Sequence, residues 1–323
     1  MKKQFVSELE PGLSCDSVFV ARDKQMRESR NKPGTQYLHV MLRDRDGEIM
    51  GRIWDNAVSL ASRFEEGDLI AVEGEVVEYN KALQVNIATL KRVSPEQLDL
   101  ADFVPCTPKE VDALIANIHA TIDSLTSRPL RALLDAFYRN EAFLIRFRRA
   151  PAAKTLHHAY LGGLAEHFCA VLVLAEALCK VYPQLSRDLL VTGVLLHDIG
   201  KLHELRQGMT FDYTDNGRLL GHIFIGAQMV NDAMRELEDF PPELSLRVTH
   251  MILSHHGTRE FGAVVLPATP EAIALHLIEN ADAQMQQVFR LIDLAKPHDA
   301  PWTEFNRLHQ RYFATGRAPL VVE

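Results

Sequence analysis

The sequence has few cysteines, and their spacing does not suit a cysteine-based site. The four are Cys15, Cys106, Cys169 and Cys179, and no two of them form a Cys-x-x-Cys pair. This spacing argues against a zinc ribbon or a redox dithiol. Reduced thiols in the cytoplasm are the simplest interpretation, so we expect a cytoplasmic protein.

Long apolar segments and a basic excess are also missing. No apolar run approaches the ~20 residues that a membrane-spanning helix needs, so no membrane partner is expected. Charge follows the first residues, Met1 to Gln4, where a signal peptide would have an apolar stretch, so none is expected. The net charge of −8 provides no global basic field for nucleic acid, although local patches can still bind phosphates.

The first part of the 323-residue chain has the pattern of a small β-barrel. Short segments rich in Val, Ile and Leu occur at 17–21, 37–42, 48–54, 69–77 and 83–90. The segment 44–47, Asp-Arg-Asp-Gly, is a hairpin signal, and 56–64 predicts a short helix. Five strands with a helix between the third and fourth predict an all-β OB-fold domain over residues 1–98.

An OB-fold commonly binds single strands on its second and third strands. In this sequence that face offers Tyr37, Arg43, Arg52 and Trp54 as predicted nucleic-acid contacts. The alternative is that Trp54 belongs to the core and that the basic side chains of the loop before the second strand, from Arg22 to Lys32, are merely solvated.

Beyond the barrel the periodicity is helical, which predicts an all-α second domain over residues 99–323 with a core at about 150–295. A capping box at Thr107-Pro108-Lys109-Glu110 predicts the start of the first helix. The predicted helices cover 108–125, 128–139, 141–148, 155–181, 187–198, 218–237, 242–255 and 270–294.

The helical domain holds almost all of the fourteen histidines, since only His39 lies in the predicted barrel. Several are at or near the ends of apolar helices, as His197-Asp198 is, with Gly200 as the predicted helix stop. Burying such polar groups separately is costly, and one shared metal centre would satisfy them together. Imidazole and carboxylate ligands suit Mn, Fe, Co, Ni or Zn. The predicted set is His167, His197, Asp198, His222, His255 and Asp282, with His256 as a further member.

This order of residues resembles the HD-domain superfamily of metal-dependent phosphohydrolases. The resemblance implies one ion held by His167, His197, Asp198 and Asp282. It implies a second ion at His222 and His255, with Asp198 bridging and His256 contacting either that ion or the phosphate. In such relatives the ions activate water and clamp the phosphate. The predicted catalytic residues are His197, Asp198 and Lys201, and the predicted phosphate contacts are Lys154, His158, Lys201 and His256.

Three segments resemble the YhaM-type 3′–5′ exoribonucleases, as does the order of an OB barrel before an HD domain. They are PAAKTLHHAYLGGLAEH at 151–167, HDIGK at 197–201, and SHHG at 254–257 followed by EFG at 260–262. The resemblance implies a manganese-preferring, homo-oligomeric exonuclease acting on the 3′ end of single strands, RNA more than DNA. One departure is that Asp282 stands in a plainer turn than the Asp-rich one typical of the family.

Other interpretations stay open at this point. The residues also fit an HD phosphohydrolase of mononucleotides or cyclic dinucleotides, a di-iron oxygenase, or a nucleic-acid-binding adaptor with a vestigial metal domain. The barrel argues against the first two, and the intact ligand set argues against the last. The residues leave the metal open among Mn, Fe, Co and Ni. Glu166 and Glu279 are predicted to orient ligand imidazoles.

Overall fold

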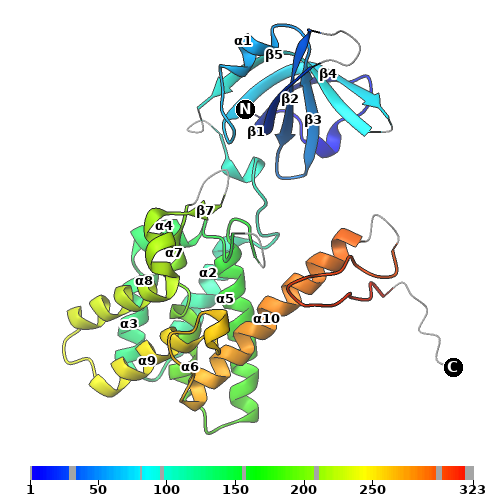
Figure 1. Ribbon diagram of the computed structural model, residues 1–323. Coiled ribbons are helices and arrows are strands. Elements are labelled where there is room, and N and C mark those ends of the chain that lie inside the picture. The colour runs from blue at the N-terminus through cyan, green and yellow to red at the C-terminus, as the bar shows by residue number, and fades with distance from the viewer. Residues whose placement is uncertain are drawn as a thin grey trace, which may run out of the picture. The chain divides into compact units, whose positions relative to one another are not determined.

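The computed structural model describes residues 2–28, 34–80, 82–94, 98–154, 158–206, 211–295 and 300–316. The chain forms two compact units that divide between Cys106 and Thr107 (Figure 1). The division falls later than residue 98 because the next segment packs on the barrel. The fully buried Phe103 forms a cluster there with Val18, Val20 and Leu69.

The first unit is a closed barrel with strand order β1-β2-β3-β5-β4, which confirms the predicted OB fold. The parallel pairing of β3 with β5 closes the sheet, and the other pairs are antiparallel. Alternating Val, Ile and Leu side chains fill the interior. The elements are β1 (Ser14–Glu28), β2 (Gln36–Arg43), β3 (Glu48–Ile53), α1 (Ala57–Ala61), β4 (Leu69–Tyr79) and β5 (Ala82–Val93).

Strand β1 is longer than its apolar pattern predicts. Its first half pairs with β4, and its second half continues to Glu28 along β2. A register shift between Arg22 and Gln25 bends the strand, and Asp23 there has a φ of +46°. The second half is largely exposed, so it carries no hydrophobic alternation that a sequence pattern could detect.

The second unit is helical, as predicted, and its helices enclose one large apolar core. A two-residue ladder, β6 (Leu205–Arg206) with β7 (Asp212–Tyr213), interrupts the helices. None of the helices in the described part of the chain combines the length and apolar character that a membrane crossing requires. The helices are α2 (Val111–Asp123), α3 (Arg128–Tyr138), α4 (Glu141–Phe147), α5 (Gly163–Val181), α6 (Arg187–Leu196), α7 (Lys201–Glu204), α8 (Asp215–Glu236), α9 (Pro242–Ser254) and α10 (Pro270–Ala295).

Two predicted helix starts are wrong. Helix α2 begins at Val111 with Glu110 as its N-cap, because the Thr107 hydroxyl donates to Glu166 Oε2 at 2.6 Å and forms no capping box. Helix α5 begins at Gly163 and not near residue 155, since Gly162 adopts a left-handed φ of +77°. Residues 155–157, where that helix was expected to begin, lie outside the described residues.

Candidate metal centre

Four of the predicted ligands are almost completely buried in the middle of the helical unit. His167, His197, Asp198 and His255 are each at most 1% exposed. They come from α5, from the end of α6 and from the end of α9. Polar groups buried this deeply need partners, so their arrangement decides what they can do.

The end of α6 is held tightly, which places His197 and Asp198. The buried Tyr138 hydroxyl donates to the carbonyl of Leu195 at 2.7 Å. Gly193 lets Met251 of α9 approach, since a Cβ at this glycine would lie 2.0 Å from Met251 Cε. Small-residue contacts of this kind bring α6 and α9 close together, and with them their terminal histidines.

Gly200 does not end a helix, so this prediction is wrong. Its φ of −59° is helical, and its carbonyl accepts from Glu204 N at 3.0 Å. The position needs glycine for a different reason. A Cβ there would lie 2.0 Å from the carbonyl oxygen of His222. Gly200 therefore lets α8 pass against the HD segment and brings His222 to Asp198.

A first group of ligand atoms surrounds one carboxylate oxygen of Asp198. His197 Nε2 lies 3.4 Å from Asp198 Oδ2 and 3.4 Å from His167 Nε2. The ligand atoms of these three residues all lie within 4.8 Å of one another. This spacing is suitable for one metal ion.

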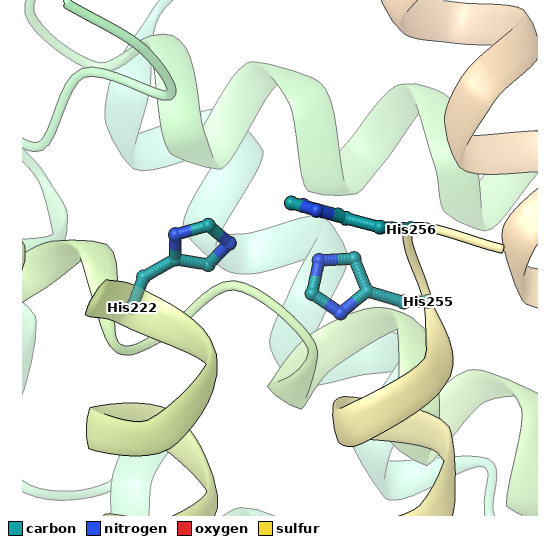
Figure 2. Close-up of side chains that lie close together, drawn as sticks. All are labelled: His222, His255 and His256. Carbon is teal, nitrogen blue, oxygen red and sulfur yellow. The ribbon is translucent and has the colours of Figure 1, made fainter. Parts of the chain in front are cut away.

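A second group surrounds the other oxygen of the same carboxylate. His222 Nε2 and His255 Nε2 lie 3.4 and 3.5 Å from Asp198 Oδ1. Figure 2 shows His222 from α8 facing His255 and His256 from the end of α9. The ligand atoms of these three histidines lie within 4.8 Å of one another. Asp198 therefore stands between two ligand groups, as a bridging carboxylate would.

The five imidazoles share one orientation, with Nδ1 turned to an acceptor. An Nδ1 that donates leaves the lone pair on Nε2, the usual arrangement of a metal-binding histidine. The acceptors are Asp282 for His167 (2.7 Å), the Val194 carbonyl for His197 (2.9 Å), Glu204 for His222 (3.0 Å), the Ile252 carbonyl for His255 (2.8 Å) and the Phe261 carbonyl for His256 (2.6 Å).

A bound cation would satisfy three buried polar atoms at the centre. Asp198 Oδ1, His222 Nε2 and His255 Nε2 are buried and have no hydrogen-bond partner among the residues that the structure describes. With Nδ1–H donated elsewhere, a neutral imidazole turns the Nε2 lone pair toward this carboxylate, and a positive charge between the three atoms would stabilise all of them. Burying unpartnered acceptors costs about 1–3 kcal/mol each, a cost that metal coordination would remove.

The protonation states mostly suit metal binding, which requires neutral imidazoles. Burial lowers the pKa of His167 to about 4 and that of His256 to about 4. Burial also lowers the pKa of His255 well below its usual value. His197 differs: burial acts to lower its pKa, but the Asp198 carboxylate outweighs burial and raises it. A metal ion would compete with that proton.

Asp282 does not join His197 and Asp198 in one ligand group. Its Oδ2 contacts His167 Nδ1 at 2.7 Å and His158 Nε2 at 3.0 Å. The His167 nitrogen that faces His197 is the other one, Nε2. In this arrangement Asp282 orients His167, and its direct ligation of an ion stays a prediction.

The outer face of the barrel groups aromatic side chains around one guanidinium. Tyr37 and Trp54 stack with ring centroids 4.6 Å apart. Trp54 is 40% exposed, which excludes the alternative that it belongs to the core. The Arg52 guanidinium lies 5.9 Å from the Tyr37 ring, 6.0 Å from Trp54 and 5.2 Å from Tyr79. This set, the aromatic platform, is Tyr37, Trp54, Tyr79 and Arg52.

Family comparisons agree with both halves of this description. Residues 164–284 match the model of the HD domain, and residues 22–93 match that of the OB-fold nucleic acid binding domain. The chain joins an OB-fold to an HD domain. HD domains bind divalent metals and act as metal-dependent phosphohydrolases, and this one contains His and Asp groups that could hold them.

Solved structures with similarity to the chain include three proteins. The second OB-fold domain of replication protein A from Methanococcus maripaludis is 22% identical, covering 31% of this chain and 100% of that one, with a TM-score of 0.23. A small single-stranded DNA-binding protein from Streptomyces coelicolor is 14% identical, with coverages of 28% and 100% and a TM-score of 0.22. Asparaginyl-tRNA synthetase from Pyrococcus horikoshii is 11% identical, with coverages of 76% and 61% and a TM-score of 0.24.

The predicted phosphate contacts of the HD domain lie in different surroundings. Lys201 is buried, and its ammonium contacts Asp198 Oδ2 at 2.6 Å. His256 belongs to the second ligand group. Lys154 pairs with Asp212 at 2.8 Å on the surface. His158 lies within the buried cluster, where its Nε2 contacts Asp282 Oδ2 at 3.0 Å.

Two acidic residues near the centre behave differently from what the sequence indicated. Glu204, which was not predicted, accepts from both the backbone N and Nδ1 of His222 at 3.0 Å. Its place three residues after Lys201 on the same helical turn was the available signal. Glu166 was predicted to orient an imidazole ligand, but it contacts Tyr160, Thr107 and Lys109. For Glu279, the other carboxylate predicted to orient an imidazole, burial raises the pKa to about 7.

The OB-fold face also includes an aromatic residue, Tyr79, that was not among the predicted nucleic-acid contacts. Tyr79 ends β4, and its ring is 54% exposed beside Arg52. An open groove of about 850 Å³ borders Trp54, with Gln36, Asn56 and Ser59 in its lining. Arg43 forms an ion pair with Glu48 at 3.6 Å.

Proposed function

We propose that the protein is a metal-dependent phosphodiesterase that removes nucleotides from the 3′ end of single-stranded RNA. The observation that carries this proposal is the Asp198 carboxylate, placed between two groups of inward-facing imidazoles. The same chain carries an OB-fold with an exposed aromatic platform. The first feature supports phosphate ester hydrolysis, and the second supports a single-stranded polymer as the substrate.

The residues present fit two divalent ions. We expect His167, His197 and Asp198 to hold one, with Asp282 as the predicted additional ligand. We expect Asp198, His222, His255 and His256 to hold the other. Mn²⁺ is the favoured metal, with Fe, Co or Ni as alternatives. When bound, such ions supply Lewis acidity that activates water and neutralises charge on the phosphate.

The protein's own side chains prepare the site for this chemistry. The hydrogen bonds to Nδ1 fix each ring with Nε2 turned inward, where the neutral form of an imidazole offers a lone pair to a metal ion. The Lys201 ammonium against Asp198 adds positive charge beside the reaction centre, which favours an anionic phosphate. On the barrel, Tyr37, Trp54 and Tyr79 offer ring faces for unpaired bases, and Arg52 adds a cation.

The test is a cleavage assay joined to metal analysis. The protein is purified without chelator, its metals are determined, and it is incubated with 5′-labelled single-stranded RNA or DNA, with and without Mn²⁺. Two ions per chain and a ladder shortening from the 3′ end would support the proposal. Ions bound but both oligomers intact would favour a phosphohydrolase of mononucleotides or cyclic dinucleotides. No ion and no cleavage would contradict the metal centre itself.

The same assay decides finer points of the proposal. The ratio of RNA to DNA cleavage measures the expected preference for RNA. The expected homo-oligomeric state and cytoplasmic location stay predictions, and light scattering on the purified protein measures the former.

A further inference from the structure

A chain of hydrogen bonds leads away from Asp282 through side chains that ligate nothing in the proposed centre. His158 Nε2 lies 3.0 Å from Asp282 Oδ2, and His158 Nδ1 lies 2.7 Å from the Tyr160 hydroxyl oxygen. His158 is buried, with 3% exposure. Both of its ring nitrogens thus face oxygen atoms inside the protein.

The far end of this chain is a carboxylate with three donors. Glu166 accepts from the hydroxyls of Tyr160 at 2.8 Å and Thr107 at 2.6 Å, and its other oxygen lies 3.0 Å from the Lys109 ammonium. With these three donors turned toward it, Glu166 accepts the hydroxyl hydrogen of Tyr160 and anchors that side chain.

The direction of the bond between His158 and Asp282 follows from the nature of the acceptor. A carboxylate offers only lone pairs, so His158 Nε2–H donates to Asp282. Asp282 Oδ2 then receives N–H groups from His158 and from His167 Nδ1. The pair of donors fixes the carboxylate, and the carboxylate fixes the His167 ring.

The backbone of His158 is held as firmly as its side chain. Its φ of +47° lies in the left-handed region, which a non-glycine residue adopts only when its surroundings impose it. Its carbonyl accepts from Ala152 N at 3.1 Å and Tyr160 N at 2.9 Å. A Cβ at Gly163 would lie 2.1 Å from this oxygen, so the start of α5 also presses on it.

We propose that His158 is a positioning residue of the metal centre, which holds Asp282 against His167 with Tyr160 and Glu166 as its support. This role replaces the phosphate contact expected from the sequence. It rests on the metal centre of the proposed function. Its effect on the proposed reaction is indirect: His158 sets the orientation of His167, whose Nε2 faces His197 and the first ligand group.

The experiment measures Mn²⁺ binding to the full chain by calorimetry, with the metal alone and no nucleic acid. The variants are His158→Leu, His158→Gln and Tyr160→Phe. The control is His119→Gln, a part-buried histidine of α2 whose Nε2 lies 2.7 Å from the Tyr138 carbonyl oxygen. Visible absorption of the Co²⁺-loaded proteins reports the ligand geometry directly.

We expect His158→Leu to weaken the affinity for the first ion about 10- to 100-fold, the range found when an outer partner of a metal ligand is removed. His158→Gln should restore most of that loss, because its amide can donate to Asp282 from the Nε2 position. Tyr160→Phe should fall between His158→Leu and wild type. His119→Gln should match wild type in both affinity and Co²⁺ spectrum.

Several results would overturn this inference. Wild-type affinity in His158→Leu would show that Asp282 needs no such donor. A loss in His158→Gln as large as that in His158→Leu, with one ion fewer per chain, would make His158 a direct ligand. Wild-type protein that binds no Mn²⁺ would overturn the centre and this role together. Normal Mn²⁺ binding with RNA left intact would contradict only the proposed nuclease activity.

Discussion

The two units of this protein place their candidate functional side chains in opposite ways. In the barrel the interior is apolar, and the aromatic platform lies on the outer face with Trp54 and Tyr79 exposed. In the helical unit the candidate metal ligands are inside, where His167, His197 and Asp198 are almost fully buried. Exposed groups can act nearly independently, whereas buried polar groups depend on each other for partners. Substitutions should therefore have local effects in the barrel and collective effects in the metal centre.

The largest expected effect comes from the residue that both ligand groups share. We predict that Asp198→Ala reduces hydrolysis to about one thousandth of wild type or less, because charge stabilisation at both proposed ions is lost together. Metal content should fall in the same variant, while binding of single-stranded oligomer by the barrel persists. The control is Asp232→Ala, an exposed aspartate paired with Arg235. Full activity of Asp198→Ala with unchanged metal content would show that the centre is wrongly assigned.

The next effect concerns Glu204, which contacts the predicted metal ligand His222 and is not itself among the predicted ligands. Glu204→Gln should weaken binding of the second ion about 10- to 100-fold, since Glu204 holds both Nδ1 and the backbone N of His222. Calorimetry with Mn²⁺ would measure this, with Glu236→Gln at the end of α8 as the control. Equal affinities in the two variants would mean that His222 is oriented by the helix alone.

A smaller and separable effect is expected on the barrel. Trp54→Ala should weaken binding of single-stranded RNA about 10-fold, within the range of about 1–3 kcal/mol for stacking of one base on an aromatic ring. Fluorescence anisotropy measures the affinity, and Leu13→Ala, also exposed on the barrel but outside the groove beside Trp54, is the control. Hydrolysis of bis(p-nitrophenyl) phosphate, which needs no strand binding, should stay unchanged. A loss of that activity too would contradict the independence of the two units.

The smallest effect is on stability in acid. In metal-free protein the pKa values of His167 and His256 are about 4, against about 6.5 when unfolded. Between these pH values the unfolded state binds more protons, so the free energy of unfolding falls as the pH drops from about 6.5 to about 4. His255 acts in the same direction, whereas the raised pKa values of His197 and Glu279 oppose it.

Circular dichroism at 222 nm follows the helical unit in this test. We expect its melting temperature to fall by several degrees between pH 7 and pH 5 in chelator-treated protein. The barrel contains a single histidine, His39, whose pKa is lowered by burial. The unfolding transition of the barrel should therefore move less than that of the helical unit. Equal shifts in the melting temperatures of the barrel and the helical unit would contradict the expected difference in their sensitivity to acid.

Much of the fold could be predicted because its signals are local. Alternating apolar residues mark the five strands, and helical periodicity marks the second unit. The failures also have local causes. The second half of β1 is exposed and carries no apolar pattern, so the prediction ended it too early. The capping box at Thr107 failed because its hydroxyl has a partner 59 residues away, Glu166, which no local pattern reveals.

The sequence by itself determined which residue types could form a metal centre and in what order they occur. Imidazole and carboxylate groups in apolar helices require a common partner wherever the helices meet, because burial of polar groups is costly. Only the tertiary structure decided how they are shared. It placed Asp198 between two groups, turned Asp282 toward His167 and His158, and brought Glu204 to His222. These assignments depend on distances of about 3 Å between residues far apart in the chain, which the packing of α5, α6, α8, α9 and α10 sets.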